Sequence, residues 1–269
     1  MPWWMVILSA IKKDHSSGVQ RLNRDQEKCK IQQKIIHKRR LDVKTSEHYW
    51  QTMKKLKIDF VSDVSCPWCA VGLASLQTAV QRLGDAVQVE LAFQPFELNP
   101  QMVPQGEDTT EHLAKKYGST PEQAAAMRET IRQRGAAVGF TFNLDKRTRI
   151  YNTFDAHRLL HWAHLEDVSG ARQLALKQAL LTAYLTDGKN PSDHATLLAV
   201  AVHVGLDATR AQAILASDEY AVEVREQESF YTGQGIHSVP AVIINDRHLI
   251  SGGQPPEVFE QALRQIAAA

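Results

Sequence analysis

The sequence predicts an α/β fold in which a long helical segment is inserted between two parts of one small sheet. Residues 57–61 and 87–93 alternate polar and apolar side chains, as β-strands do, and the stretch between them has the spacing of a helix. Helix signals then follow one another over residues 105–234. Residues 235–269 return to strand, turn and helix, so both ends of this region are expected to share one sheet.

The length and composition are those of a globular protein with a substantial core. The chain has 269 residues, of which 43% are apolar and 23% are charged, enough for one large domain or two modest ones. Charge is unevenly distributed: residues 1–57 hold 14 Lys and Arg against 5 Asp and Glu, and residues 58–269 hold 17 against 25. The N-terminal part is therefore a different kind of chain from the rest.

Residues 1–52 are predicted to be a disordered basic extension, because residues 12–44 are basic and polar without sustained apolar periodicity. A basic arm for nucleic acid or an anionic membrane is the functional alternative. Few aromatic residues are interleaved with the charges, so we expect neither partner. The apolar run 3–10 is shorter than the roughly 20 residues of a membrane-spanning helix. The sequence from Met53 leads straight into a strand, so we expect a chain start there.

Two of the three cysteines form a Cys-x-x-Cys pair, Cys66-Pro67-Trp68-Cys69, where the first strand gives way to a helix. Three cysteines are too few for the disulfide framework of a secreted domain, so we expect a cytoplasmic location or a redox site. Pro67 suits the first turn of a helix, because its missing N–H has no intrahelical partner there. The helix is expected to stop at Gly84.

The position of Cys66 predicts a reactive thiol. The unpaired N–H groups and the dipole of a helix N-terminus favour the thiolate, and they can lower the pKa of such a thiol from about 8.5 to between roughly 3.5 and 7.5. Pro67 and Trp68 supply no cation, so we expect the helix to set most of this pKa shift. Half of a zinc site is the structural alternative, but the sequence has no second Cys-x-x-Cys or Cys-x-x-His pair.

The inserted segment is expected to be helical over residues 106–185 and beyond. Thr120-Pro121-Glu122-Gln123 combines a hydroxyl cap, a proline in first position and a glutamine three residues on, which is typical of a helix start. Further helices are predicted over 152–165, 171–185 and 190–205, from Asp207, and over 218–234.

His157, His161 and His164 lie on one face of a predicted helix, a spacing that can bind zinc or copper. The sequence fixes no fourth ligand, so packing, or lining a cleft with Phe154, is the favoured interpretation. Three arginines are candidates for holding an anion, although a solvated face is the usual place for such charges: Arg147, Arg149 and Arg158.

The last 35 residues predict a hairpin and a closing helix. Residues 235–244 are expected to form a strand opened by proline, 245–246 a tight turn and 247–252 the antiparallel partner. The helix that follows starts at the prolines after Gly253 and carries apolar residues at helical spacing.

Four separated motifs, in this order, resemble the DsbA family of thioredoxin-like oxidoreductases, and specifically its FrnE-like branch. They are SDVSCPWC at 62–69, FQPFELN at 93–99, NTFDAHRL at 152–159 and GIHSVP at 235–240. The resemblance covers residues 53–268. It implies a thioredoxin fold formed by residues 53–104 and 235–269, with an all-helical domain of residues 105–234 inserted into it.

The resemblance also implies a second half of the site. Pro240 is expected to follow a cis peptide bond and to face Cys66, while the exposed backbone of Val239 pairs with an extended substrate. The predicted site residues are therefore Cys66 and Cys69 for catalysis, with Pro67, Trp68, Val239 and Pro240 for substrate binding.

These features predict a thiol-disulfide oxidoreductase or isomerase that acts on a disulfide- or thiol-containing protein or peptide. Cys66 would form a mixed disulfide that Cys69 resolves, without a bound cofactor or metal and with glutathione as a candidate co-substrate. Asp63 and Asp59 are candidates for assisting proton transfer to Cys69, although a surface carboxylate is the favoured interpretation of both.

The alternative function is a glutathione-dependent isomerase or transferase of the kappa and 2-hydroxychromene-2-carboxylate type, which resembles the same architecture. Those enzymes typically carry a serine where Cys66 stands, so the presence of both cysteines favours dithiol chemistry. A redox-inert binding module is a third interpretation.

Overall fold

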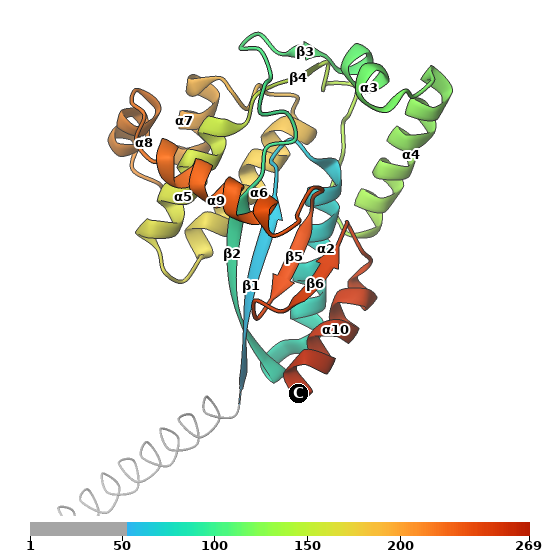
Figure 1. Cartoon of the computed structure of the whole chain (residues 1–269), viewed down its shortest axis with the longest axis vertical. Coiled ribbons are helices and arrows are strands. Elements are labelled where there is room, and N and C mark those ends of the chain that lie inside the picture. The colour runs from blue at the N-terminus through green and yellow to red at the C-terminus, as the bar shows by residue number, and fades with distance from the viewer. Residues whose placement is uncertain (1–52) are drawn as a thin grey trace, which may run out of the picture. The chain divides into compact units, whose positions relative to one another are not determined.

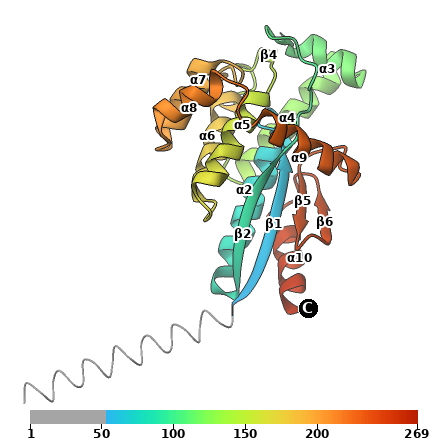
Figure 2. The same ribbon diagram turned by 60° about the vertical axis from the view of Figure 1, so that its left-hand side comes forward.

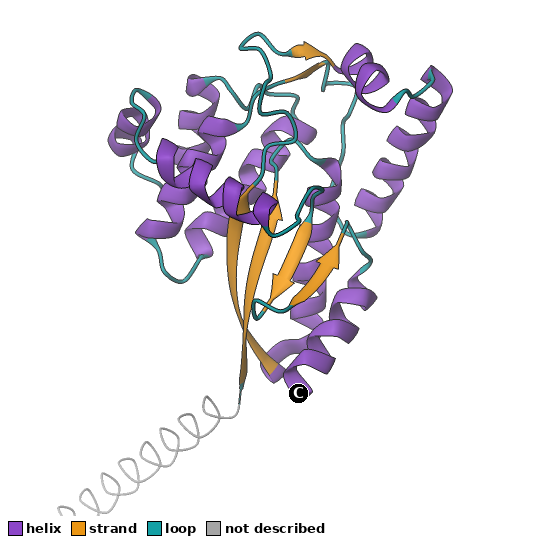
Figure 3. Cartoon of the chain, viewed as in Figure 1, coloured by secondary structure: helices purple, strands orange, loops and turns teal. Residues whose placement is uncertain are grey.

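A four-stranded sheet with the order β2-β1-β5-β6 is the centre of the structure (Figure 1). The structure, a computed structural model, describes residues 53–269, so the extension predicted over residues 1–52 lies outside it. The strands are β1 (Lys54–Ser62), β2 (Val87–Pro95), β5 (Ala241–Ile244) and β6 (His248–Ser251). β1 is parallel to β2 and antiparallel to β5, and β5 is antiparallel to β6 (Figure 3). The predicted parallel strand pair and the predicted hairpin are both confirmed.

The two faces of the sheet bury different sets of side chains. On one face, α2 (Pro67–Leu83) and α10 (Pro256–Ala268) pack together on a cluster that contains Phe60, Leu76 and Phe259. Alternate strand residues point the other way, where Val61 and Ala241 pack against Tyr231. Each fully buried apolar side chain contributes roughly 1.5–3 kcal/mol to stability. The helix α2 ends before Gly84, as predicted, and a short 3-10 turn, η1 (Gly84–Ala86), leads into β2.

Between β2 and β5 the chain is mostly helical. The helices are α3 (Thr109–Tyr117), α4 (Pro121–Ala137), α5 (Phe154–Glu166), α6 (Ala171–Leu185), α7 (His194–His203), α8 (Ala208–Leu215) and α9 (Ala221–Gly233). The predicted capping box is present: the Thr120 hydroxyl accepts the N–H of Gln123 at 3.3 Å, and the Gln123 side chain accepts the N–H of Thr120 at 2.9 Å. Asp207 caps α8 as expected, by accepting the N–H of Arg210.

The helical pattern predicted over residues 106–185 does not hold between α4 and α5. Residues 138–153 form turns and the short strand β4 (Arg149–Ile150), which pairs with β3 (Glu107–Asp108). The Arg149 guanidinium donates to the carbonyls of Gln105 and Gly106 at 3.0 and 2.8 Å and fixes this pairing. Contacts between segments that are distant in sequence do not affect the local spacing of apolar residues, so this strand pairing could not be predicted from that spacing. The starts of α5 and α9, at residues 154 and 221, also fall later than the predicted 152 and 218.

The helices α5 to α8 share a second buried cluster and lie beside β2, far from β6 (Figure 2). This cluster includes Leu159, Trp162, Leu180, Leu197 and Ile214. Val64, in the turn between β1 and α2, is part of it. The helical segment therefore has its own apolar interior and packs directly on the turn that precedes the cysteines. The division at residues 105 and 234 stays a prediction.

The outer edge of β2 is bound by a side chain of α6. The Gln173 amide accepts the N–H of Phe93 at 2.9 Å and donates to the Phe93 carbonyl at 3.1 Å. The same amide donates to the carbonyl of Leu160 on α5 at 3.2 Å. One buried glutamine thus joins the edge strand to two helices.

The hairpin turns at Asn245 and Asp246, whose φ angles are +52° and +55°. Two successive residues with positive φ are typical of a type I′ turn, and the Arg247 N–H donates to the Ile244 carbonyl at 3.2 Å. Ile244 pairs with His248, so residues 245–247 form the loop and the second strand starts one residue later than predicted.

The predicted start of the first strand of the hairpin at residue 235 is wrong, because β5 begins at Ala241 and residues 235–240 form a loop. Pro240 has no N–H to contribute to a strand ladder.

Two glycines allow α2 to approach the loops on either side of the hairpin. A Cβ on Gly72 would lie 3.0 Å from Cγ of Pro240, and a Cβ on Gly253 would lie 2.9 Å from the Trp68 carbonyl oxygen. The start of α2 is therefore packed between these two loops without space for a methyl group.

Gly253→Ala is expected to lower the free energy of unfolding by about 1–3 kcal/mol, because the new methyl group would overlap a backbone carbonyl that cannot rotate away. Gly233→Ala is the matched control. No atom lies within 4 Å of a Cβ at that position, and helix propensity predicts a gain of about 1 kcal/mol at most. Urea unfolding curves measure both effects, and equal midpoints for the two variants would contradict the close contact.

Candidate functional site

Cys66 is the N-cap residue of α2 and follows the buried turn at the end of β1. Its carbonyl accepts the N–H groups of Cys69 at 3.1 Å and of Ala70 at 3.4 Å, which closes the first helical turn. Pro67 occupies the first helical position, as predicted. Cys66 is 4% exposed, Cys69 is fully buried, and both are free thiols. A substrate therefore meets Cys66 first.

The two thiols ionise very differently. Hydrogen bonding from the Cys69 side chain is the strongest effect on Cys66 and lowers its pKa, as do the backbone N–H groups of Cys69 and Trp68, while burial and the charge of Asp63 oppose this. Burial raises the pKa of Cys69 well above its ordinary value, and the interaction with Cys66 raises it further. The N–H groups at the helix start lower the pKa of Cys66, as expected, and the Cys69 thiol is a further and larger single influence that the sequence did not predict.

The loop before β5 supplies the second half of the site. The Val239–Pro240 bond is cis, the isomer that the resemblance implies. The sulfur of Cys66 lies 3.7 Å from the Val239 carbonyl oxygen, within the range of a thiol hydrogen bond. Val239 is half-buried rather than exposed, and Pro240 is buried. With Pro67 and Trp68, both half-buried, the structure brings all six predicted residues together.

Asp63 and Asp59 are both buried, so the favoured surface interpretation is wrong for each. The Asp63 carboxylate accepts the N–H groups of Ser65 at 3.0 Å and Leu98 at 2.7 Å, and its charge raises the pKa of Cys66. Asp59 accepts from Gln94 at 2.6 Å and lines a cleft formed with α5 and α9. Its strand neighbour Phe60 faces α2, so Asp59 points away from the cysteines.

The three histidines line one small internal cavity of about 70 Å³. His157 is 2% exposed, its Nε2 lies 3.9 Å from Oδ1 of Asp63, and this nitrogen has no hydrogen-bond partner among residues 53–269. Burial lowers the pKa of His157 to about 4, so the ring is neutral at pH 7. Within the described residues no three His, Cys, Asp or Glu side chains are grouped as metal ligands. The packed interpretation therefore fits this helix face better than the metal one.

The three candidate arginines are separate and bind the protein itself. Arg147 donates to the Tyr184 hydroxyl at 2.8 Å. Arg158 is buried and donates to Asp155 and to three backbone carbonyls around the end of α8. Arg149 holds the β3 loop, as described above. Their common role is to join segments of the helical region, and they do not converge on an anion site.

Lys177 of α6 is a charged group beside the cysteines that sequence reasoning missed. It is fully buried, and its Nζ donates to the Ser62 carbonyl at 3.5 Å. Burial lowers the pKa of Lys177 to about 8, although the charges of Cys69, Asp63 and Cys66 raise it. A signal did exist, because residues 173, 177, 180 and 184 lie at helical spacing on a buried face that carries a glutamine and a lysine.

The buried carboxylate of Glu97 forms an ion pair with the partly exposed Arg225, and this pair ties together the loops around the site. Glu97 follows β2 and also accepts from the Asn152 amide at 2.9 Å. Arg225 lies on α9 with its guanidinium 3.8 Å from the centre of the Phe154 ring. Burial raises the pKa of Glu97 to about 7, with Arg225 acting in the opposite direction. The loop after β2 is thereby fixed to the starts of α5 and α9.

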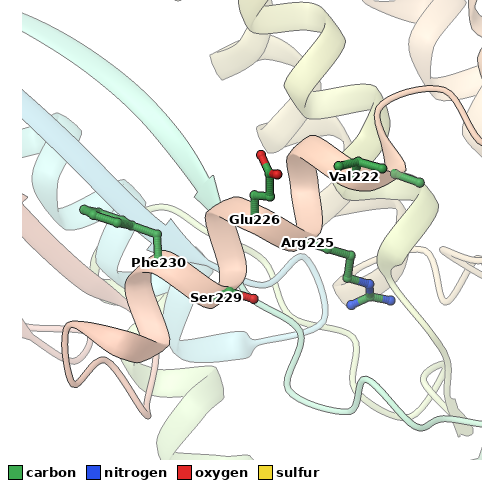
Figure 4. A pocket seen from close by; sticks show the side chains of 6 residues that line it. Val222, Arg225, Glu226, Ser229 and Phe230 are labelled. Carbon is green, nitrogen blue, oxygen red and sulfur yellow. The ribbon is translucent and has the colours of Figure 1, made fainter.

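A surface pocket of about 670 Å³ follows the outer side of α9 (Figure 4). It is lined by Ala221, Val222, Arg225, Glu226, Ser229 and Phe230. Val222 and Phe230 are 66% and 58% exposed. None of the six predicted site residues lines this pocket, which is therefore distinct from the dithiol.

The family follows from comparison with known proteins. The DSBA-like thioredoxin domain matches residues 57–264. The chain belongs to the DsbA-like thioredoxin family. A Streptomyces coelicolor protein described as a probable DsbA oxidoreductase is 34% identical, with 78% of this chain and 89% of its own chain aligned and a TM-score of 0.72. The DsbA-like thioredoxin fold with a helical insertion is thus confirmed.

Two further proteins are similar to this chain at lower identity. YwbO of Bacillus subtilis, an uncharacterised protein, is 26% identical over 207 residues, which is 77% of this chain and 94% of YwbO. The cytosolic disulfide reductase DsbM from Pseudomonas aeruginosa, in a structure with GSH, is 14% identical with a TM-score of 0.55 and covers 79% of this chain and 100% of DsbM. In this DsbA-like chain, no helix among residues 53–269 has the length and apolar composition to cross a membrane.

Cys69→Ala is expected to raise the pKa of Cys66, because it removes the hydrogen bond that lowers this pKa most. The pH dependence of iodoacetamide alkylation measures this pKa, and mass spectrometry assigns the modified residue so that Cys29 does not interfere. Cys66→Ala is the matched variant, in which the remaining thiol, Cys69, should react only at high pH. An unchanged pKa of Cys66 in Cys69→Ala would show that the backbone alone sets it.

Glu97→Gln is expected to change the pH dependence of stability. With a folded pKa of about 7 and an unfolded value of about 4.3, protonation of Glu97 favours folding at low pH. This contribution is fully present below the unfolded pKa and is lost as the pH rises through 7. The variant lacks it, so its free energy of unfolding minus that of the wild type should rise from pH 4.5 to 7.5.

Denaturant unfolding at each pH measures this difference. Glu129→Gln, which removes an exposed carboxylate on α4, controls for the loss of one charge. A difference between Glu97→Gln and wild type that stays constant with pH would refute the raised pKa.

Proposed function

We propose that this protein is a thiol-disulfide oxidoreductase that uses the Cys66-Pro67-Trp68-Cys69 dithiol. The observation that carries the proposal is the pair of opposed pKa shifts, lowered at Cys66 and raised at its buried neighbour Cys69. Cys66 is therefore the thiol that more readily forms the attacking thiolate, and Cys69 stays protonated until the later, resolving step. Membership of the DsbA-like family supports the same class of reaction.

The reaction runs through a mixed disulfide. The Cys66 thiolate attacks a substrate disulfide, one substrate sulfur leaves, and a bond forms between Cys66 and the other sulfur. Cys69 then attacks Cys66, the second substrate sulfur leaves, and the Cys66–Cys69 disulfide forms. Run in reverse, the oxidised protein takes electrons from a substrate dithiol. The low pKa of Cys66 assists both directions, because a thiolate attacks and a low-pKa thiol leaves readily.

The substrate in this proposal is a peptide or protein segment in extended form. Its backbone would pair with Val239, whose carbonyl lies next to the Cys66 sulfur. Pro67, Trp68 and Pro240 would supply the apolar surface around the reacting sulfur. The resemblance to the FrnE-like branch implies the same placement of the substrate. The small number of cysteines supports a cytoplasmic location, which is also part of this proposal.

Glutathione is the small thiol proposed as co-substrate. The structure of DsbM with GSH supports this, since the two chains share their fold. Glutathione would reduce the Cys66–Cys69 disulfide and return the protein to the dithiol state. The competing function, glutathione-dependent isomerisation or transfer on a small molecule, would place glutathione opposite residue 66 without any need for Cys69.

Cys66→Ser is expected to lower the rate of insulin disulfide reduction by about 100-fold or more, because it removes the nucleophile. Cys69→Ser should still attack but should accumulate a mixed disulfide, detected as a mass adduct of the substrate or of glutathione. Cys29→Ser serves as the control and should keep full activity.

Full insulin reductase activity in both Cys66→Ser and Cys69→Ser would exclude the dithiol mechanism. Glutathione-dependent turnover of a 2-hydroxychromene-2-carboxylate that persists in Cys66→Ser would favour the competing function instead.

A further inference from the structure

Lys177 is a buried charge for which the two-cysteine reaction assigns no role. Its ammonium group has three N–H protons, and its hydrogen bond in the described structure is to the Ser62 carbonyl at 3.5 Å. The Phe93 ring lies 5.9 Å from Nζ. A buried ammonium with so few partners destabilises the fold, and an apolar side chain of the same length would be more favourable there. The loss of stability caused by burying this ammonium group indicates that Lys177 has a role in the chemistry of the cysteines.

The groups around Lys177 come from each element packed against α6. β1 and the turn after it supply the Ser62 carbonyl and Asp63, β2 supplies Phe93, and α2 supplies the two cysteines. The neutral His157 faces it from α5. Among the ionisable neighbours, the charge of Cys69 acts on Lys177 most strongly, ahead of Asp63 and Cys66. The buried cation is thus coupled mainly to the resolving cysteine.

Lys177 and Asp63 both lie near the cysteines, but their opposite charges have opposite effects on the ionisation of a neighbouring thiol. Cys69 must lose its proton to attack the mixed disulfide, and burial opposes this. The Asp63 carboxylate is negative and accepts two backbone N–H groups, so it holds the turn but its charge cannot favour a neighbouring thiolate, although the backbone of Asp63 does lower the pKa of Cys69. Lys177 carries the opposite charge and does favour it.

We infer that Lys177 is a positioning residue for the resolving step, holding a positive charge beside Cys69 while that thiol ionises and attacks. The inference rests on the proposed oxidoreductase function. In the step, the Cys69 proton passes to water, the Cys69 thiolate attacks Cys66, and the bond between Cys66 and the substrate sulfur breaks. The substrate sulfur leaves as a thiolate and takes a proton from water. The substrate is reduced, and the dithiol is oxidised to the Cys66–Cys69 disulfide.

The test separates the two steps of the reaction in Lys177→Met, with Lys189→Met, at an exposed lysine, as the charge control. A glutathione adduct on Cys66 is formed in each protein and its loss is followed by quenched-flow mass spectrometry from pH 5 to 9. Removing the Lys177 charge raises the pKa of Cys69, and each unit by which this pKa rises lowers the thiolate fraction at pH 7 about ten-fold. We expect resolution in Lys177→Met to be at least about ten-fold slower at pH 7, with its pH profile displaced upward.

The first step provides the internal comparison. Alkylation of Cys66 should stay within about three-fold of wild type, because Lys177 is not among the main influences on the pKa of Cys66. Lys177→Gln, which is neutral but polar, should behave like Lys177→Met. Resolution at the wild-type rate and with the wild-type pH profile in either variant would overturn the inference. If wild type itself formed no adduct or never resolved it, the proposed function would fail instead.

A measurement on the unaltered protein keeps the inference testable should the variants not fold. The ¹⁵N shift of Lys177 Nζ, followed against pH by NMR, should titrate at a higher pH in the dithiol state than in the disulfide state, because only the dithiol can present a thiolate to it. Identical titrations in the two states would overturn the inference.

Discussion

The removal of two neighbouring thiols from water is the constraint on which the rest of the site depends. A thiolate in this position survives only if donors are aimed at it, and the donors here are the Cys69 thiol and the first N–H groups of α2. They are in place only because α2 begins at Pro67. That start is fixed in turn by Asp63, whose carbonyl accepts the N–H of Cys66 at 3.3 Å and whose side chain accepts that of Ser65.

The helical segment contributes to this arrangement through polar contacts as much as through packing. Asp63 also accepts the N–H of Leu98, and the adjacent Glu97 is paired with Arg225 of α9. The turn before the cysteines, the loop after β2 and the helix that leads to Val239 are therefore joined by a hydrogen bond to the buried Asp63 carboxylate and by the ion pair between the buried Glu97 and the partly exposed Arg225. Both carboxylates lie in a region of low dielectric, where the loss of a partner is costly.

Local signals were sufficient for much of the fold. The Thr120 capping box, the helix start at Pro67 and the turn at Asn245 each depend on neighbours in sequence, and each is present. The cysteine pair is likewise recognisable from spacing alone. The features that could not be read in advance depend on distant segments: the β3–β4 pairing rests on Arg149, and the burial of Asp63 rests on Leu98.

Lys177 shows the same limit at the site itself. Its position on a buried helix face is visible from spacing, but the cysteines beside it are more than 100 residues away in sequence. Pattern can show that a lysine is buried; only the packing of α6 on the sheet shows what it faces. The effect of the Cys69 thiol on the pKa of Cys66 could not be predicted from the sequence for a related reason. A helix start depends on residues that are neighbours in sequence, whereas a hydrogen bond between two side chains depends on their rotamers.

The amide of Gln173 has a consequence for how the molecule meets other chains. A free sheet edge accepts any extended segment that offers matching N–H and C=O groups, including a misfolded copy of the same protein. At Phe93, near the carboxyl end of β2 and close to the redox centre, both groups are already bound by one side chain. Strand addition is therefore blocked at this point of the outer edge, and a passing polypeptide finds no second backbone ladder there.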